Sequence, residues 1–201
     1  MDFTAVKKNL EERGFKVSAF ATAKEAAEYL NRKIDGSSVS FGGSMTLAQM
    51  GLFDSLGAHN TIYSHWNVPD GMNAAEVLRN ASTCDNYLLS ANGLAETGEI
   101  INIDGTGNRV SSSLYGHKKV WFVVGSNKLA PTYEEALWRA RNISAPKNAQ
   151  RLGVKTPCAV NGERCYDCKS PQRICRGLVV MWEAIRSCET EVVLIDEPLG
   201  Y

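Results

Sequence analysis

The sequence predicts an α/β fold in which helices cover both faces of a mostly parallel sheet, with a cysteine-rich appendage near the C-terminus. β-prone runs alternate with capped, amphipathic helices, and the run Val120–Gly125 is almost continuously apolar, as in a strand buried on both faces. With 44% apolar residues in 201, the chain can bury the core of one domain. We expect residues 1–150 to form an α/β core, and residues 151–201 to supply a metal-binding segment and terminal strands that complete the same domain.

The first half of the chain carries clear signals for where helices begin and end. Thr4 can cap a helix that ends at Gly14, and Thr22 with Glu25 forms a capping box for a helix through Ile34. The other predicted elements of this half are a strand over 15–20, a strand near 39–41, a helix over 44–57, a strand over 61–66, a helix opened by Asn73 and Glu76, and a strand over 87–90.

The second half is richer in glycine and then changes character. A strand over 100–103 lies between glycine-bearing turns, and the central strand 120–125 precedes a helix capped by Thr132 with Glu135, which Pro146 is expected to interrupt or end. The β-prone runs 178–182 and 191–195 can pair as a terminal hairpin or join the main sheet.

Charge and hydropathy exclude several classes of partner. Lysine plus arginine total 22 and aspartate plus glutamate total 22, so no global field favours a nucleic acid or an anionic membrane. The N-terminal residues are polar, and no stretch reaches membrane-spanning length. We therefore expect a cytoplasmic protein, and the oligomeric state stays open.

Four of the six cysteines crowd into a short segment and predict a metal centre. Their spacing is Cys-x6-Cys-x2-Cys-x6-Cys, and the inner pair can place two thiolates on one metal or one cluster. Disulfides explain the crowding less well, because the polar N-terminal residues do not have the pattern of a signal peptide and we expect a cytoplasmic protein. The predicted metal ligands are Cys158, Cys165, Cys168 and Cys175.

The identity of the metal stays open between iron–sulfur and zinc. Structural zinc sites more often use two Cys-x2-Cys pairs, whereas this segment has one, which favours a 4Fe-4S cluster. Six basic residues against two acidic ones between Arg151 and Arg176 suit an anionic four-thiolate centre of either kind.

Two glycine-bearing turns are candidates for binding a phosphate or a carboxylate. The first, Gly42–Thr46, follows a predicted strand and opens a helix, although a plain turn with an N-cap explains it equally well. The second, Gly105–Arg109, carries an arginine that can grip an anion in a bidentate way. Glu96 follows another strand end and is a candidate base or nucleophile, and His65 is a candidate for the same crevice.

Several short motifs together resemble the lactate-utilisation (LUD) domain family, over nearly the whole chain. They are the Gly-Gly-Ser-Met-Thr turn at 42–46, Ala-Glu-Thr-Gly-Glu-Ile at 95–100, Gly-Asn-Arg-Val at 107–110, Val-Val-Gly-Ser-Asn-Lys at 123–128 and Leu-Gly-Tyr at 199–201. The resemblance implies a three-layer α/β fold like that of ribose-5-phosphate isomerase, glucosamine-phosphate deaminase and coenzyme A transferases. It also implies an association with iron–sulfur-dependent oxidation of lactate to pyruvate.

Carried over by position, the resemblance implies one crevice at the strand ends. The residues that it places there are Gly43, Ser44, Thr46, Glu96, Thr97, Gly98, Asn108 and Arg109. The chain departs from larger lactate-utilisation subunits because it lacks tandem Cys-x2-Cys-x2-Cys motifs, so it is not a two-cluster electron conduit by itself.

Three functions follow from these features. In the first, a 4Fe-4S protein of lactate or 2-hydroxy acid utilisation binds a small anionic metabolite and works with redox partner subunits. The second is a non-redox isomerase or an acyl- or CoA-transferase-like enzyme, in which Glu96 is catalytic and the cysteines hold structural Zn²⁺. The third is a metabolite-sensing or assembly module without catalysis.

Overall fold

The centre of the molecule is a six-stranded sheet with the order β1-β10-β7-β4-β2-β3, in which every pairing is parallel. The computed structural model describes residues 2–64, 66, 68 and 70–201. The strands of this sheet are β1 (Lys16–Phe20), β2 (Ser38–Phe41), β3 (Thr61–Tyr63), β4 (Asn86–Leu89), β7 (Lys119–Gly125) and β10 (Glu189–Ile195). The predicted parallel α/β fold is thereby confirmed, and β7 is a central strand buried along nearly its whole length.

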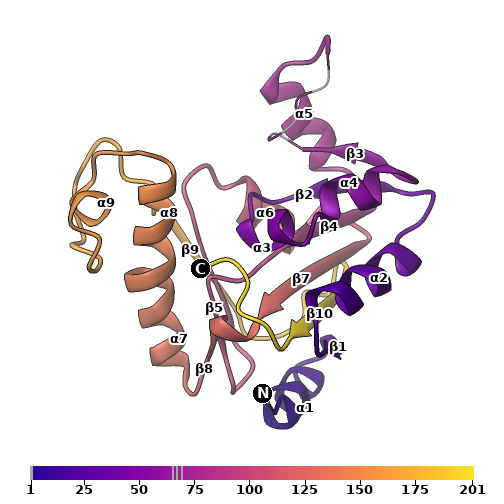
Figure 1. The fold of residues 1–201 in the computed structure, drawn as a ribbon, viewed down its shortest axis with the longest axis horizontal. Helices are drawn as coiled ribbons and strands as arrows, with labels where there is room; N and C mark the ends of the chain where they lie inside the picture. The colour runs from indigo at the N-terminus through magenta and orange to yellow at the C-terminus, as the bar shows by residue number, and fades with distance from the viewer. Residues whose placement is uncertain (1, 65, 67, 69) are drawn as a thin grey trace.

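Two hydrophobic layers follow from the alternation of side chains along the central strands. In β7, Val120 and Phe122 join one core cluster, whereas Trp121 and Val123 join the other. The second cluster packs against the helices α2, α3 and α4, which cover that face of the sheet (Figure 1). The bounds of the helices in the first half are α1 (Thr4–Glu12), α2 (Ala23–Lys33), α3 (Met45–Gln49), α4 (Leu52–Gly57) and α5 (Ala74–Ala81).

A second, smaller sheet covers part of the other face. Its order is β8-β5-β6-β9, and β6 pairs antiparallel with both β5 and β9. Its strands are β5 (Gly93–Ala95), β6 (Ile100–Asp104), β8 (Leu129–Ala130) and β9 (Gly177–Met181). Leu94 and Ile100 reach the core of the main sheet, while Ala95 and Ile101 pack against α7 (Tyr133–Arg139).

One long helical rod runs along the outer side of the small sheet (Figure 1). It is composed of α7, a π-helical turn at Ala140–Ser144 and α8 (Ala145–Arg151). Pro146 was expected to interrupt or end this helix, and it interrupts it: the α-helical pattern gives way to the π-helical turn, and the rod then continues as α8. Proline lacks the N–H that an α-helix would bond one turn back, and the wider turn directly before Pro146 accommodates that missing donor.

Two local expectations were wrong. Thr4 does not cap α1, because its N–H and hydroxyl both donate to Asp2 Oδ1. The helix predicted over 44–57 is split by Gly51, which has a φ of 62°. The last two β-prone runs were expected to pair as a hairpin or to join the main sheet. β10 does join the main sheet, between β1 and β7, whereas β9 joins the small sheet.

The capping boxes and the central strands are as the sequence predicts. Thr22 with Glu25 caps α2, and Asn73 with Glu76 caps α5, each through reciprocal side-chain and backbone hydrogen bonds. Two shorter helices complete the chain, α6 (Asn108–Leu114) and α9 (Pro157–Asn161). The cysteine-bearing residues from α9 onward pack against α8, on the side of the rod away from the main sheet (Figure 1).

Candidate functional site

A cavity of about 490 Å³ lies between the main sheet and the rod of α7 and α8. Its walls come from the segments that follow β2, β4 and β7, represented by Ser44, Ser90 and Lys128. The opposite wall comes from α8 and from residues 173–176. The carboxyl ends of parallel strands meet at one edge of a sheet, which is where open α/β sheets bind ligands.

The cavity is strongly cationic. The basic side chains in its wall are Arg109, Lys128, Arg151, Arg173 and Arg176, and the only carboxylate side chain that the structure describes there is Asp104. Asp104 is already engaged, because it accepts from the backbone N–H of Gly105, Arg109 and Val110 at the start of α6. The excess of positive charge therefore favours an anionic ligand.

Arg109 is the most completely bonded of these cations. Its Nη1 donates to Asn102 Oδ1 at 2.6 Å and its Nη2 to Asn92 Oδ1 at 2.9 Å, and it also donates to the backbone oxygens of Ser90 and Ile103. All four acceptors are neutral, so they fix the guanidinium without cancelling its charge. Burial lowers the pKa of Arg109, and the charge of Asp104 opposes that shift.

The turn after β2 approaches Arg109 closely enough to require glycine. A Cβ atom at Gly42 would lie 2.9 Å from Arg109 Cγ and 3.0 Å from Tyr87 Oη. Gly43 and Ser44 line the cavity, and the Ser44 hydroxyl accepts from the Leu47 N–H at 3.4 Å as the N-cap of α3. Thr46 lies one layer behind the wall, where it is fully buried.

The structure brings together half of the predicted crevice residues and separates the others. Gly43, Ser44, Asn108 and Arg109 line the cavity. The other segment, 96–98, forms the turn between β5 and β6 and lies against α1, where Asn9 donates to the Glu96 backbone oxygen and Arg13 to that of Thr97.

The strand before this second segment explains the separation. Glu96 does follow a strand end, but that strand is β5 of the small sheet, so its end lies at a different edge from β2 and β4. The Glu96 side chain is exposed, and Gly98 takes a φ of 103° beside Arg13. His65 lies outside the described residues.

Lys128 is a wall residue to which the sequence analysis assigned no role. It lies in a 3-10 turn, Ser126–Lys128, directly after β7, and only 4% of it is exposed. Its Nζ donates to the hydroxyls of Thr46 and Ser90, each at 2.9 Å. Burial, with the charges of Arg139 and Arg109, lowers the pKa of Lys128 to about 7. One sequence signal could have identified Lys128 as a site residue: it is a lysine just beyond the carboxyl end of an apolar central strand.

The four clustered cysteines line one small pocket on the far side of residues 173–175. The Asp167 N–H donates to Cys165 Sγ at 3.3 Å, and Arg141 Nη2 lies 4.0 Å from the same sulfur. Asp167 takes a φ of 45°, which turns the chain between Cys165 and Cys168. These donors suit a thiolate at Cys165.

The donor set of this pocket fits a four-thiolate metal centre. All six cysteines are free of disulfides, and the four that line the pocket offer only soft sulfur ligands. Within the described ranges, no group of three or more His, Cys, Asp or Glu side chains is already arranged to hold a metal ion. The nearby charge of Cys175 raises the pKa of Arg173, whose guanidinium donates to the backbone oxygens of Cys168 and Cys175.

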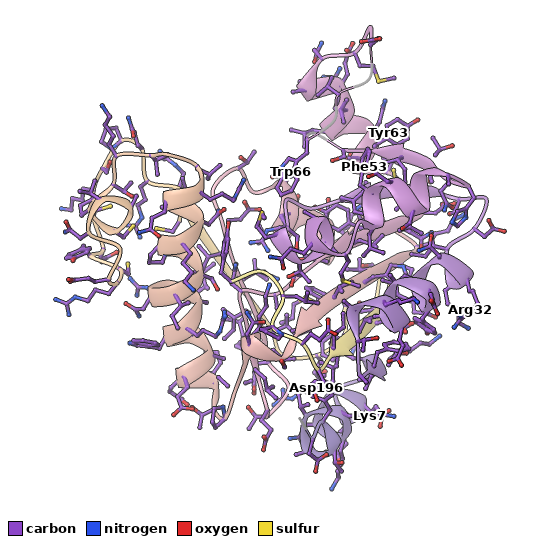
Figure 2. The ribbon with its side chains drawn as sticks, viewed as in Figure 1. Lys7, Arg32, Phe53, Tyr63, Trp66 and Asp196 are labelled. Atoms are coloured by element: carbon purple, nitrogen blue, oxygen red, sulfur yellow. The ribbon has the colours of Figure 1, made fainter. Side chains whose placement is uncertain are left out.

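The cysteine pocket and the cationic cavity share a wall. Arg173, Ile174 and Cys175 line both, together with Ala145 of α8. A smaller apolar pocket of about 220 Å³ adjoins the cavity at Gly43 and Ser44, and its lining includes Phe53 and Trp66, which Figure 2 labels on this side of the molecule. The cavity therefore has a cationic centre, an apolar side pocket and a cysteine-bearing wall.

No helix in the part of the chain that the structure describes is long and apolar enough to span a membrane.

Comparison with known proteins gives a family and a related fold. The model of the LUD domain matches residues 4–195. A DUF162 family protein from Deinococcus radiodurans superposes with a TM-score of 0.54 at 12% identity, covering 97% of this chain and 99% of that one. Among curated proteins, no sequence match was found.

Two further structures superpose over about half of the chain. They are translation initiation factor eIF-2B from Pyrococcus horikoshii, at a TM-score of 0.37 and 13% identity over 55% of this chain and 48% of that one, and ribose 5-phosphate isomerase from Plasmodium falciparum, at 0.32 and 12% over 54% and 52%. The LUD model, in contrast, spans almost every element of the fold, from α1 to β10. This chain belongs to the LUD domain family.

Proposed function

We propose that this protein binds a small 2-hydroxy or 2-oxo acid in the cationic cavity, beside a four-cysteine metal centre, as a component of iron–sulfur-dependent lactate utilisation. One observation carries the proposal: Cys175 and Arg173 line both the cavity and the cysteine pocket. A ligand in the cavity would therefore lie next to one of the residues that hold the centre. Membership of the LUD domain family supports the connection with lactate.

The residues of the cavity suit a carboxylate bound to a small polar carbon skeleton. Arg109 supplies a fixed positive charge, and the exposed side chains of Arg151 and Arg176 add further donors. Ser44, Ser90 and Asn108 offer neutral groups for a hydroxyl or carbonyl oxygen. Such a mixture of charge and neutral donors recognises both ends of a 2-hydroxy or 2-oxo acid.

The cysteine pocket would hold the metal centre through Cys158, Cys165, Cys168 and Cys175. When bound, a 4Fe-4S cluster supplies the exchange of single electrons, so the proposal includes a redox partner subunit. Arg141 and Arg173 place positive charge beside the thiolates, and the Asp167 N–H donates to Cys165 Sγ. These groups lower the cost of concentrating negative charge in the pocket.

The first test measures iron and acid-labile sulfide in the full chain purified without oxygen, with the visible spectrum recorded alongside. We expect iron, sulfide and a visible chromophore in the wild type, and loss of all three in Cys165→Ser. Cys188→Ser is the matched control, because the Cys188 thiol contacts the Thr190 hydroxyl and does not line the cysteine pocket. Zinc in place of iron, at one per chain, would contradict the redox proposal and make the centre structural.

A second measurement addresses the ligand. Isothermal titration of lactate and pyruvate into the same protein should show binding that Arg109→Gln abolishes. No binding of either acid, nor of longer 2-hydroxy and 2-oxo acids, would overturn the metabolite part of the proposal.

A further inference from the structure

Lys128 has the surroundings of a lysine that reacts rather than one that only pairs with charge. Its amine lies in the wall of the cavity, almost wholly buried, and the structure shows no ion pair between it and a described carboxylate. Its two hydrogen bonds go to the hydroxyls of Thr46 and Ser90. The charged groups that act on it are Arg139 and Arg109, which are both cations.

The hydrogen bonds match the donors of a neutral amine. A neutral amine has two N–H groups and one lone pair, whereas an ammonium has three N–H groups. The hydroxyls of Thr46 and Ser90 accept the two N–H groups, and Thr46 can accept because its own proton goes to the Leu199 backbone oxygen at 3.1 Å. The lone pair is then left for an electrophile in the cavity. A lysine that is desolvated, or lies beside another cation, is activated as a nucleophile in this way.

We infer that Lys128 is a nucleophile that forms an imine with the carbonyl carbon of a 2-oxo acid bound in the cavity. This inference rests on the proposed function, because the same cationic wall that holds the carboxylate brings the adjacent carbonyl group to the amine. Simple hydroxy acids lack the electrophilic carbon, so the reaction selects the oxo acid from the pair.

The step balances without an oxidant or a reductant. The Nζ lone pair forms a bond to the carbonyl carbon, and the carbonyl oxygen gains a proton as the nitrogen loses one. The resulting carbinolamine then loses that oxygen as water and becomes the imine. Ser90 is suited to relay the proton, because its hydroxyl is bonded to Nζ and also lines the cavity. Once formed, the imine withdraws electrons and acidifies the C–H bonds on the carbon beyond it.

Reductive trapping tests the inference directly. The full chain, purified without oxygen, is incubated with pyruvate and sodium cyanoborohydride, and the adduct is located by peptide mass mapping. We expect a reduced pyruvyl adduct on Lys128 of the wild type. The peptide map identifies the modified lysine directly, without a variant. Lys128→Met should lose the adduct, and Lys8→Met should keep it, because Lys8 is an exposed residue of α1 paired with Glu12.

Proton exchange gives a second reading that a structural role would not produce. In deuterated water, the wild type should exchange the methyl protons of pyruvate faster than buffer does, as followed by proton NMR. Lys128→Met should reduce that exchange to the rate of buffer. Ser90→Ala should slow the exchange by a larger factor than it weakens the binding of pyruvate, as expected for a residue that relays the proton as well as lining the cavity.

Binding measurements separate the two possible failures. If pyruvate binds in titration but neither an adduct on Lys128 nor methyl exchange is seen, the imine is overturned and the proposed function stands. If no 2-oxo acid binds and none is trapped, the imine is overturned; if 2-hydroxy acids do not bind either, the metabolite part of the proposed function fails as well. An adduct on other lysines alone, at the same level in Lys128→Met, also overturns the inference.

Discussion

At the scale of the residue, Arg109 shows how the fold fixes a charged side chain in the cavity wall without an ion-pair partner at its hydrogen bonds. Its guanidinium is held by two amide oxygens and two backbone oxygens, all of them neutral. A carboxylate in that place would fix the side chain equally well but would cancel its charge. The two asparagines, Asn92 and Asn102, therefore act as neutral supports for a cation that the cavity needs.

Arg109→Lys tests this arrangement. An ammonium cannot reach four separate acceptors, so Asn92 and Asn102 would lose partners, and the free energy of unfolding should fall by about 1–3 kcal/mol. Affinity for pyruvate or lactate should fall at least about tenfold, which corresponds to ~1.4 kcal/mol. Urea denaturation and titration calorimetry measure the two effects. Arg79→Lys on the exposed face of α5 is the control. Equal effects in both variants would contradict the role proposed for the Arg109 guanidinium.

Lys128 predicts a pH dependence of stability. Its pKa is lowered from 10.5 to about 7 in the folded chain, so below about pH 7 both the folded and the unfolded chain carry the proton and the cost of burying the charge is fully present. As the pH rises from about 7 to about 10, the folded chain releases the proton while the unfolded chain keeps it, and the cost disappears.

Lys128→Met should therefore be more stable relative to wild type near pH 6 than near pH 10, by a difference on the order of a few kcal/mol. Urea denaturation across that pH range measures the difference in the free energy of unfolding. Lys8→Met is the control, and its difference from wild type should not change with pH. Parallel curves for wild type and Lys128→Met would show that Lys128 is charged in the folded chain.

At the scale of the element, the segment that carries the cysteines has little of its own core. None of the residues of α9 is buried, and the loop that follows is held mainly by side-chain hydrogen bonds such as that from Arg173 to the Cys168 backbone oxygen. A bound metal would thus supply much of the order of this segment.

Removing the metal, by a chelator or by Cys165→Ser, should make this segment the first site of proteolysis. Limited digestion followed by mass spectrometry should show early cuts within residues 157–176, while the α/β core persists. Cys188→Ser should be digested like the wild type. Identical patterns for Cys165→Ser and wild type would mean that the segment is ordered without metal.

Local signals explain which elements could be predicted from the sequence. Each of three confirmed predictions depends on residues that are close together in the sequence. They are the capping boxes at Thr22 and Asn73 and the apolar run of β7. The small sheet was not predicted, because β5 has three residues and β8 has two, which is too short for any periodicity, and their pairing joins distant parts of the chain.

The candidate site divides along the same line. Ser44 and Arg109 could be assigned to the site because each lies in a glycine-bearing turn that adjacent residues of the sequence identify. The cations Arg151 and Arg173 could not, because they reach the cavity only through the packing of α8 and the cysteine segment against the rest of the fold. Glu96 was grouped with Ser44 and Arg109 because it follows the predicted strand over 87–90, and the three-residue strand β5 that lies between them was not predicted.

At the scale of the whole molecule, β10 is the strand on which the sheet depends. It lies between β1 and β7, and β1 has no other neighbour in the sheet. Val193 and Ile195 point into one core cluster while Val192 and Leu194 point into the other. One strand thus joins both hydrophobic layers.

Leu194→Ala should reduce the free energy of unfolding by about 2–5 kcal/mol, because it removes a fully buried side chain from a close-packed layer. Leu178→Ala in β9 is the control, since that side chain is 49% exposed. Its effect should stay within about 0.5 kcal/mol. Urea denaturation compares the two, and similar losses for both variants would contradict the central role of β10.

The position of β10 in the sequence also orders events during translation. A ribosome makes β1 near the start of the chain, but the only neighbour of β1 emerges more than 160 residues later, after the whole cysteine segment. Pairings this distant along the chain form slowly. The four thiols therefore leave the ribosome before the main sheet can close, so the cysteine segment is made while the core of the protein is still open.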